Sequence, residues 1–162
     1  MAKQKEEKTN VMRTLEQKKI SYTAHAYPHE DGVAVDGVTV AQSLGQDPEQ
    51  VFKTLVARGA SKGIYVFVIP VAENLDLKKA ARAVGEKSIE MVAVKEINAL
   101  TGYIRGGCSP VGMKKQYPTV FHETAEIVDT IMVSAGKIGL QVEVEPNALI
   151  ELVGASMADL TV

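Results

Sequence analysis

Hydrophobic and polar positions alternate along the chain with two periodicities, which predict short helices and short strands. Val11, Met12 and Leu15 recur at helical spacing, so we predict a helix over residues 6–19. Gly85 and Gly102 follow two other apolar segments and mark helix ends. Helices are therefore predicted at 6–19, 39–44, 76–84, 94–100 and 146–152, with a further helix start at Asp47-Pro48-Glu49.

Runs rich in β-branched residues predict the strands. These runs cover residues 20–26, 54–58, 64–70, 88–92, 119–122, 130–133 and 141–144. Residues 59–63 form a predicted hairpin turn and 28–37 a mobile loop, while the tail after 152 is unassigned. Because short turns join several strands, the sequence favours an α+β fold with a mixed or antiparallel sheet and peripheral helices.

Length and composition narrow the class of protein. A chain of 162 residues suits one domain, so we expect a single domain over 1–162. One thiol, a charged N-terminus and no apolar run of bilayer length indicate a soluble, cytoplasmic protein. The net charge of −2 lacks the basic excess of proteins that hold nucleic acid alone. Such a protein binds no nucleic acid, or binds it through a local patch with help from a partner.

The segment Gly102–Gly112 is the first candidate site. It holds four glycines and one proline in eleven residues. Glycines permit close backbone approach, and consecutive N–H groups can form a nest for an anion. A tight structural turn explains the same glycines without any ligand. The segment is not a phosphate-binding P-loop, because no Gly-Lys-Ser/Thr ending follows.

Lys53 and Ser134 are further candidates. Lys53 is the only charge in the apolar run 51–56, where partial burial would lower its pKa and suit it to an active site. A lysine whose stem reaches along the surface to water is the alternative. Ser134 opens the small-residue turn 134–139 and either points into a cleft or belongs to an ordinary hairpin.

The other reactive side chains lack the neighbouring groups that catalysis or metal binding requires. Cys108 lies in the glycine loop, yet no sequence signature pairs it with a base. The three histidines show no zinc-ligand spacing, so we expect neither a metal nor a cofactor. Lys114 and Lys115 are either solvated charges or contacts for a phosphate beside the glycine loop.

Several of these segments, in this order and spacing, resemble one family. They are residues 18–22, 50–55, 70–72, 75–79, 101–103, 106–107, 109–110, 112, 133–134 and 136–137. From residue 10 onward the chain resembles the YbaK/EbsC family. That family comprises Cys-tRNA(Pro) deacylases related to the editing domain inserted in some prolyl-tRNA synthetases.

The resemblance implies a fold and a site. The implied fold is a mixed, barrel-like sheet surrounded by helices, and the implied catalytic residues are Lys53, Gly106 and Gly107. Substrate binding is implied at Tyr22, Thr54, Ser109 and Ser134, and at the position of Gln141. Two positions depart from some relatives: Gln141 is neutral where they carry an acid, and Val35-Asp36 stands where they carry an aromatic. Both departures would reshape the aminoacyl pocket.

The implied function is trans-editing of mischarged tRNA. The protein would remove an amino acid, cysteine above all, from tRNA(Pro), with aminoacylated tRNA and prolyl-tRNA synthetase as partners. The cysteinyl thiol would attack its own ester, so no protein nucleophile is required. A non-catalytic module that binds a nucleotide or an RNA end as a regulator is the alternative. For either function, we predict that Lys53 lines a cleft with residues 106–112.

Overall fold

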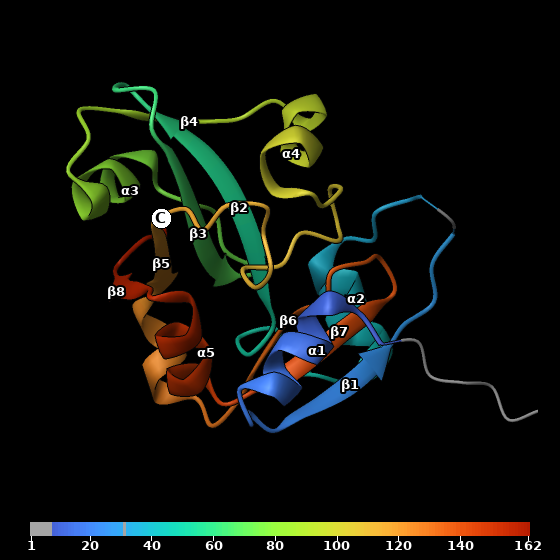
Figure 1. Cartoon of the computed structure of the whole chain (residues 1–162). Coiled ribbons are helices and arrows are strands. Elements are labelled where there is room, and N and C mark those ends of the chain that lie inside the picture. The colour runs from blue at the N-terminus through green and yellow to red at the C-terminus, as the bar shows by residue number, and fades with distance from the viewer. Residues whose placement is uncertain (1–7, 31) are drawn as a thin grey trace, which may run out of the picture.

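The computed structural model describes residues 8–30 and 32–162, and it confirms a mixed α+β fold (Figure 1). The predicted first helix begins later than expected, at Asn10, because Thr9 caps it by accepting from the Met12 N–H. Glu6 and Glu7, the first residues of that prediction, lie outside the described range. No helix in this range is long and apolar enough to cross a membrane. The helices are α1 Asn10–Gln17, α2 Gly37–Leu44, α3 Leu77–Val84, α4 Val94–Thr101, the 3₁₀ helix η1 Glu123–Ile127, and α5 Pro146–Val153.

The strands of the described residues form two sheets. They are β1 Tyr22–Ala26, β2 Phe52–Gly59, β3 Ile64–Pro70, β4 Ile89–Met91, β5 Thr119–His122, β6 Ile131–Ser134, β7 Leu140–Val144 and β8 Ser156–Ala158. The smaller sheet has the order β1-β7-β6 and the larger β4-β2-β3-β5-β8. The pairs β3–β5 and β5–β8 are parallel, and the other pairs are antiparallel. A parallel bridge between Val51 and Met132 joins the sheets without closing a barrel, so the barrel-like shape is not confirmed.

Two local predictions needed correction. Asp47 does not begin a helix: its carboxylate accepts from the Glu49 N–H in a turn, and the chain enters β2 at Phe52. The turn leaves no room for helical propagation before the strand. The unassigned tail contains β8, whose partner β5 is distant in sequence. A strand of three residues carries too little pattern to be recognised without that partner.

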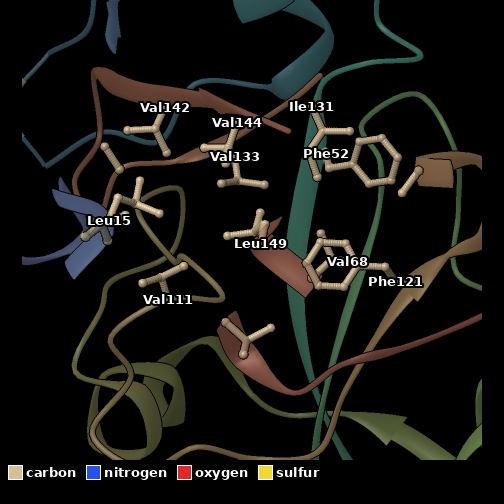
Figure 2. Packing of buried hydrophobic residues seen from close by; sticks show 14 of the residues in the cluster. Leu15, Phe52, Val68, Val111, Phe121, Ile131, Val133, Val142, Val144 and Leu149 are labelled. Atoms are coloured by element: carbon tan, nitrogen blue, oxygen red, sulfur yellow. The ribbon is translucent and has the colours of Figure 1, made fainter. Parts of the chain in front are cut away.

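The main core lies where the two sheets and α5 meet (Figure 2). Phe52, Val68 and Phe121 come from the larger sheet, and they pack with Leu149 of α5. The smaller sheet and α1 complete the cluster with Leu15, Ile131, Val133, Val142 and Val144. Burial of these apolar side chains is the main force that holds the two sheets together.

Alternation along β2 sends neighbouring side chains to opposite faces of the sheet. Leu55 and Ala57 pack in the cluster that includes α3, whereas Val56 packs with Cys108 beneath α4. Figure 1 shows α3 and α4 on opposite sides of the β2–β3 pair accordingly. Lys53 and Thr54 must therefore leave the strand on different faces.

Candidate functional site

Lys53 emerges on the face of β2 that Val51 shares, beside α2. Its Nζ donates to the Val71 carbonyl oxygen at 3.3 Å. Partial burial lowers the pKa of the Lys53 ammonium, and the nearby carboxylates of Asp36 and Glu73 oppose that shift. Lys53 is thus partly buried, as predicted, and two nearby acids favour its charged form.

Helix α2 brings Asp36 to this position. Asp36 is the N-cap and accepts from the Thr39 N–H at 3.2 Å. A side chain on Gly37 would meet the Cγ1 atom of Val71 at 2.5 Å, so the helix start is pressed onto the residue that accepts from Lys53. Only a glycine at the first helical position allows this approach.

The glycine loop contacts two other segments through its central glycines. A Cβ on Gly106 would lie 2.7 Å from the Ala34 side chain, and Gly106 has a φ of +88°. A Cβ on Gly107 would meet the backbone of Lys137 and Ile138 at 3.1 to 3.2 Å. The loop therefore lies directly against the turn that follows Ser134. The Gly107 N–H donates to the Ile104 carbonyl at 2.9 Å, so a role for it in binding an oxyanion requires this bond to open.

Hydrogen bonds make the rest of this loop a fixed scaffold. The Tyr103 hydroxyl donates to the Val111 carbonyl, and the Tyr117 hydroxyl donates to Leu100. Ser109 is fully buried, and its Oγ accepts from the Val111 N–H at 3.3 Å. The structure thus gives the predicted substrate-binding serine a contact inside the loop.

Ser134 and Gln141 lie side by side in the smaller sheet, where their Cα atoms are register partners. The Ser134 hydroxyl accepts from the Gly136 N–H at 3.1 Å. Gln141 is only 4% exposed, and its Oε1 accepts from Gln46 Nε2 at 2.9 Å. Since Gln46 directly follows the Gly45 C-cap of α2, this hydrogen bond ties α2 to the smaller sheet.

His25 pairs with Gln141 from the other side, but it does not activate Ser134. His25 Nε2 contacts Glu143 at 2.8 Å, and the Thr130 hydroxyl holds the other carboxylate oxygen. Both hydrogen bonds lower the pKa of Glu143, with the bond from Thr130 the larger cause. Strand β7 separates His25 from Ser134, and two strand spacings amount to about 10 Å.

Tyr22 shares a groove with Lys137 of the turn that follows Ser134, and Thr54 lies on β2. Tyr22 packs on the α1 side of the smaller sheet, and its hydroxyl donates to Glu16 at 2.7 Å. It lines a groove of about 580 Å³ whose other walls include Met12, His29 and Lys137. The Thr54 hydroxyl is buried and, within the described residues, has no hydrogen-bond partner.

The structure groups the predicted site residues into connected clusters. Lys53 lies with Asp36 at α2, while Gly106 and Gly107 lie against the turn after Ser134. The segment 33–37 touches both groups through Ala34 and Asp36. No hydrogen bond or ion pair joins Lys53 to residues 106–112 in the range that the structure describes, so their shared cleft stays a prediction. Across the same range, no three His, Cys, Asp or Glu side chains are placed to hold a metal ion.

Sequence reasoning named Asp36 only as a departure in the aminoacyl pocket and missed its place beside Lys53. It also missed Gln46 and the His25–Glu143 pair. Asp36 had a local signal, because an aspartate before Gly37 is a plausible helix cap. Gln46 had none, since its partner lies 95 residues away.

Comparison with known proteins assigns this arrangement of sheets, glycine loop and turn to a family of domains. The model of the aminoacyl-tRNA editing domain matches residues 33–152, and the chain belongs to this family. A protein of Enterococcus faecalis named "Putative Cys-tRNA(Pro)/Cys-tRNA(Cys) deacylase EbsC" is 47% identical over 163 residues. That match covers 99% of this chain and 98% of the relative.

Solved structures show the same fold. One described as "a putative trans-editing enzyme for prolyl tRNA synthetase" superposes with a TM-score of 0.79 at 26% identity, covering 96% of this chain and 99% of that chain. A hypothetical protein superposes with a TM-score of 0.83 at 22% identity, covering 94% of this chain and 99% of that chain. At that identity the second likeness concerns the fold alone.

Proposed function

We propose that this protein is a trans-editing aminoacyl-tRNA deacylase that removes cysteine from mischarged tRNA(Pro). The observation that carries the proposal is the 47% identity, over almost the whole chain, to a relative named for deacylation of Cys-tRNA(Pro) and Cys-tRNA(Cys). The proposal treats residues 1–162 as one editing domain. Because its substrate arises where tRNA is charged, we also propose a cytoplasmic location.

The proposed reaction uses the substrate's own thiol. The cysteinyl sulfur attacks the ester carbonyl carbon, the bond from that carbon to the ribose oxygen breaks, and the thiol proton ends on the released ribose hydroxyl. The products are a cysteine thiolactone and free tRNA. An intramolecular attack held in a reactive geometry gains roughly 7–11 kcal/mol, so the protein acts mainly by holding the ester in place.

Lys53 and the glycine loop have distinct proposed roles. The Lys53 ammonium, kept charged by Asp36 and Glu73, binds the terminal phosphate or the developing oxyanion. The amide of Gly106 donates to the same oxyanion, as does that of Gly107 once its bond to the Ile104 carbonyl opens, and a well-placed donor contributes roughly 3 kcal/mol. Tyr22, Thr54, Ser109, Ser134 and Gln141 are the proposed substrate contacts.

The state of the protein's own nucleophiles supports this scheme. Burial raises the pKa of the Cys108 thiol to about 11, so almost none of it is thiolate at neutral pH. The hydroxyls of Ser109 and Ser134 each accept from a backbone N–H, and His25 lies two strands from Ser134. The substrate thiol, with an ordinary pKa near ~8.5, is a better nucleophile than these groups.

Product analysis tests the proposal. Purified protein is incubated with tRNA(Pro) charged with cysteine, serine, alanine or proline, and the released compound is identified by mass spectrometry. We expect thiolactone from the cysteinyl ester and far slower release of serine, whose hydroxyl is the poorer nucleophile. Free cysteine formed directly by attack of water would overturn the mechanism. Absence of any cleavage would favour a non-catalytic module that binds a nucleotide or RNA end.

A synthetase partner is the remaining part of the proposal. The net charge of −2 gives the protein little general attraction for RNA. We propose that prolyl-tRNA synthetase presents the charged tRNA, which would relieve the deacylase of binding it alone. Adding the synthetase should then lower the KM for Cys-tRNA(Pro), and it should leave kcat unchanged.

A further inference from the structure

Two glutamine side chains meet beneath the end of α2. Gln46 Nε2 donates to Gln141 Oε1 at 2.9 Å, and this bond joins residues from different parts of the chain. The backbone of Gln46 is itself fixed, because its N–H donates to the Ala41 carbonyl at 2.9 Å just after the left-handed Gly45. Gln46 therefore approaches Gln141 from a rigid support.

The pair leaves one polar atom without a partner. Gln46 Oε1 is buried, and no hydrogen bond reaches it from the part of the chain that the structure describes. A buried acceptor without a donor destabilises the folded protein, since water satisfies it in the unfolded chain. Such an atom is therefore a position where a ligand that brings a donor would gain affinity.

The pair also lies next to the proposed aminoacyl site. Gln141 is the register partner of Ser134, and Ser134 opens the turn whose backbone touches Gly107. Helix α2, which ends at Gln46, begins at the Asp36 cap beside Lys53. The N-terminal end of α2 thus lies near Lys53, and a hydrogen bond joins Gln46, just past its C-terminal end, to Gln141.

We propose that Gln46 and Gln141 form one binding unit, in which Gln46 orients the Gln141 carboxamide and its own Oε1 accepts from a hydrogen-bond donor of the aminoacyl group. This inference rests on the proposed deacylase function. Two donors of the substrate have the required chemistry, the α-ammonium and the side-chain thiol or hydroxyl. Two carboxamides keep their mutual hydrogen bond when both turn over, so this neutral pair can offer either an acceptor or a donor.

Kinetics of three variants test the proposal. Gln46→Leu removes the amide at similar volume. Gln46→Glu keeps an acceptor to which a turned Gln141 amide can donate. Gln42→Leu changes an exposed glutamine of the same helix and is the matched control. Each protein is assayed with Cys- and Ser-tRNA(Pro), and Ala-tRNA(Pro), which has no side-chain nucleophile, is added as a competitive inhibitor of Cys-tRNA(Pro) cleavage. Thermal unfolding is followed in parallel. Cleavage by the wild type in this assay tests the proposed function separately.

We expect Gln46→Leu to raise KM for Cys-tRNA(Pro) roughly 3- to 10-fold, the loss typical of one hydrogen bond, with kcat nearly unchanged. Gln46→Glu should recover most of this loss, and Gln42→Leu should match the wild type. An equal rise in the inhibition constant of Ala-tRNA(Pro) assigns the contact to the α-ammonium. A rise confined to the cysteinyl and seryl esters assigns it to the side chain.

A double variant gives an independent readout. If the two carboxamides act as one unit, then Gln46→Leu should add little to the KM of Gln141→Leu. Additive effects of the two substitutions would overturn the shared unit. So would a Gln46→Leu protein with wild-type KM for the cysteinyl and seryl esters and a wild-type inhibition constant for Ala-tRNA(Pro), or one whose only change is a lower unfolding temperature.

Discussion

At the scale of single residues, Lys53 and Cys108 differ in how burial alters their chemistry. Partial burial lowers the pKa of Lys53, but Asp36 and Glu73 lie near enough to favour the ammonium. Deeper burial raises the pKa of the Cys108 thiol to about 11, and the smaller opposing effect is a hydrogen bond with Thr101. Burial thus leaves Lys53 able to act as a cation, whereas it keeps Cys108 neutral.

Replacing Lys53 should slow the reaction. We expect Lys53→Ala to reduce kcat/KM for Cys-tRNA(Pro) roughly 10²-fold, because a cation near the ester is lost. Lys53→Arg should restore only part of the rate, since a guanidinium is a broad planar group. Lys78→Ala, which changes an exposed lysine of α3, is the control for general charge effects. Equal rates for Lys53→Ala and Lys78→Ala would remove Lys53 from the mechanism.

The pH profile gives a second test of the same residue. The pKa of Lys53 is lowered, so its positive charge is lost as pH rises through a value below the ~10.4 of an ordinary lysine. The rate should first rise with pH as the substrate thiol ionises and then fall as Lys53 loses its proton. In Lys53→Arg the fall at high pH should vanish, because a guanidinium stays charged.

Cys108 should be dispensable for turnover. A neutral, buried thiol is a poor nucleophile, so Cys108→Ser should keep most of the wild-type kcat. Single-turnover rates, measured below the unfolding temperature of both proteins, check this. A fall of roughly 10²-fold with an intact fold would indicate a true catalytic group at position 108.

At the scale of elements, the connection between α4 and β5 stands out by its charge. Residues 97–122 contain no Asp or Glu, although the chain has 20 acids in all, and they carry Arg105, Lys114 and Lys115. These three cations are exposed, and hydrogen bonds from the Tyr103 and Tyr117 hydroxyls to backbone carbonyls hold the connection in place. A local basic surface beside the glycine loop is therefore available to phosphates in a protein with net negative charge.

Removing two of these cations should weaken tRNA binding. We expect the double variant Lys114→Ala, Lys115→Ala to raise KM without a matching fall in kcat, and to reduce the slope of log affinity against log salt by about 1 to 2. The matched control is Lys78→Ala, Lys87→Ala, which changes one lysine of α3 and one that follows it. Helix α3 lies on the opposite side of the β2–β3 pair from α4 (Figure 1). An equal change in both double variants would indicate a net-charge effect.

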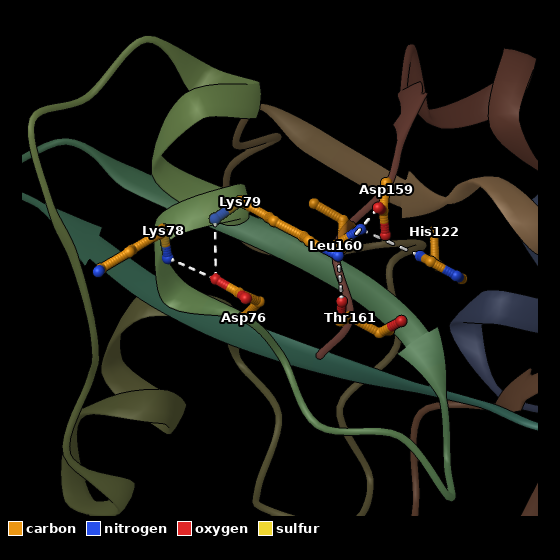
Figure 3. Close-up of polar contacts among 7 residues, drawn as sticks. All are labelled: Asp76, Lys78, Lys79, His122, Asp159, Leu160 and Thr161. Carbon is orange, nitrogen blue, oxygen red and sulfur yellow. Dashed lines mark hydrogen bonds and ion pairs between the residues drawn. The ribbon is translucent and has the colours of Figure 1, made fainter.

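At the scale of the whole molecule, the C-terminal residues form one edge of the larger sheet. Strand β8 pairs with β5, and the Leu160 N–H donates to His122 Nδ1 at 3.1 Å (Figure 3). Lys79 of α3 reaches the Asp159 carboxylate and the Thr161 carbonyl. The Leu160 side chain is fully buried among residues of α3 and the sheet. The last residues therefore hold α3 against the sheet.

Truncating the Leu160 side chain should destabilise the fold. We expect Leu160→Ala to lower the free energy of unfolding by about 2–5 kcal/mol, the usual cost of a cavity in a core. Denaturant unfolding measures this change. Val162→Ala, at a side chain that is 84% exposed, should change it by less than ~0.5 kcal/mol. Similar small losses in both variants would show that the tail does not hold the sheet.

The elements themselves followed from the sequence to within a few residues. Periodicity, caps and glycine stops are local signals, so strands such as Thr119–His122 and helices such as Pro146–Val153 were predicted nearly as they occur. Failures came where a local signal was outweighed or absent. The Asp47 turn had a helix-start signature, but the chain continues into the extended strand β2 and no helix forms. Strand β8 pairs with β5, which lies more than 30 residues earlier, so no local signal announces it.

The sequence by itself determined the α+β class, the candidate residues Lys53 and Gly106, and the family resemblance, because each depends on residue type and spacing. Only the tertiary structure decided which of these residues meet. Asp36 lies near Lys53 because α2 packs on Val71, and Gln46 meets Gln141 because α2 ends over the smaller sheet. Such contacts join segments far apart in the chain, and their geometry depends on how whole elements pack, which no local pattern encodes.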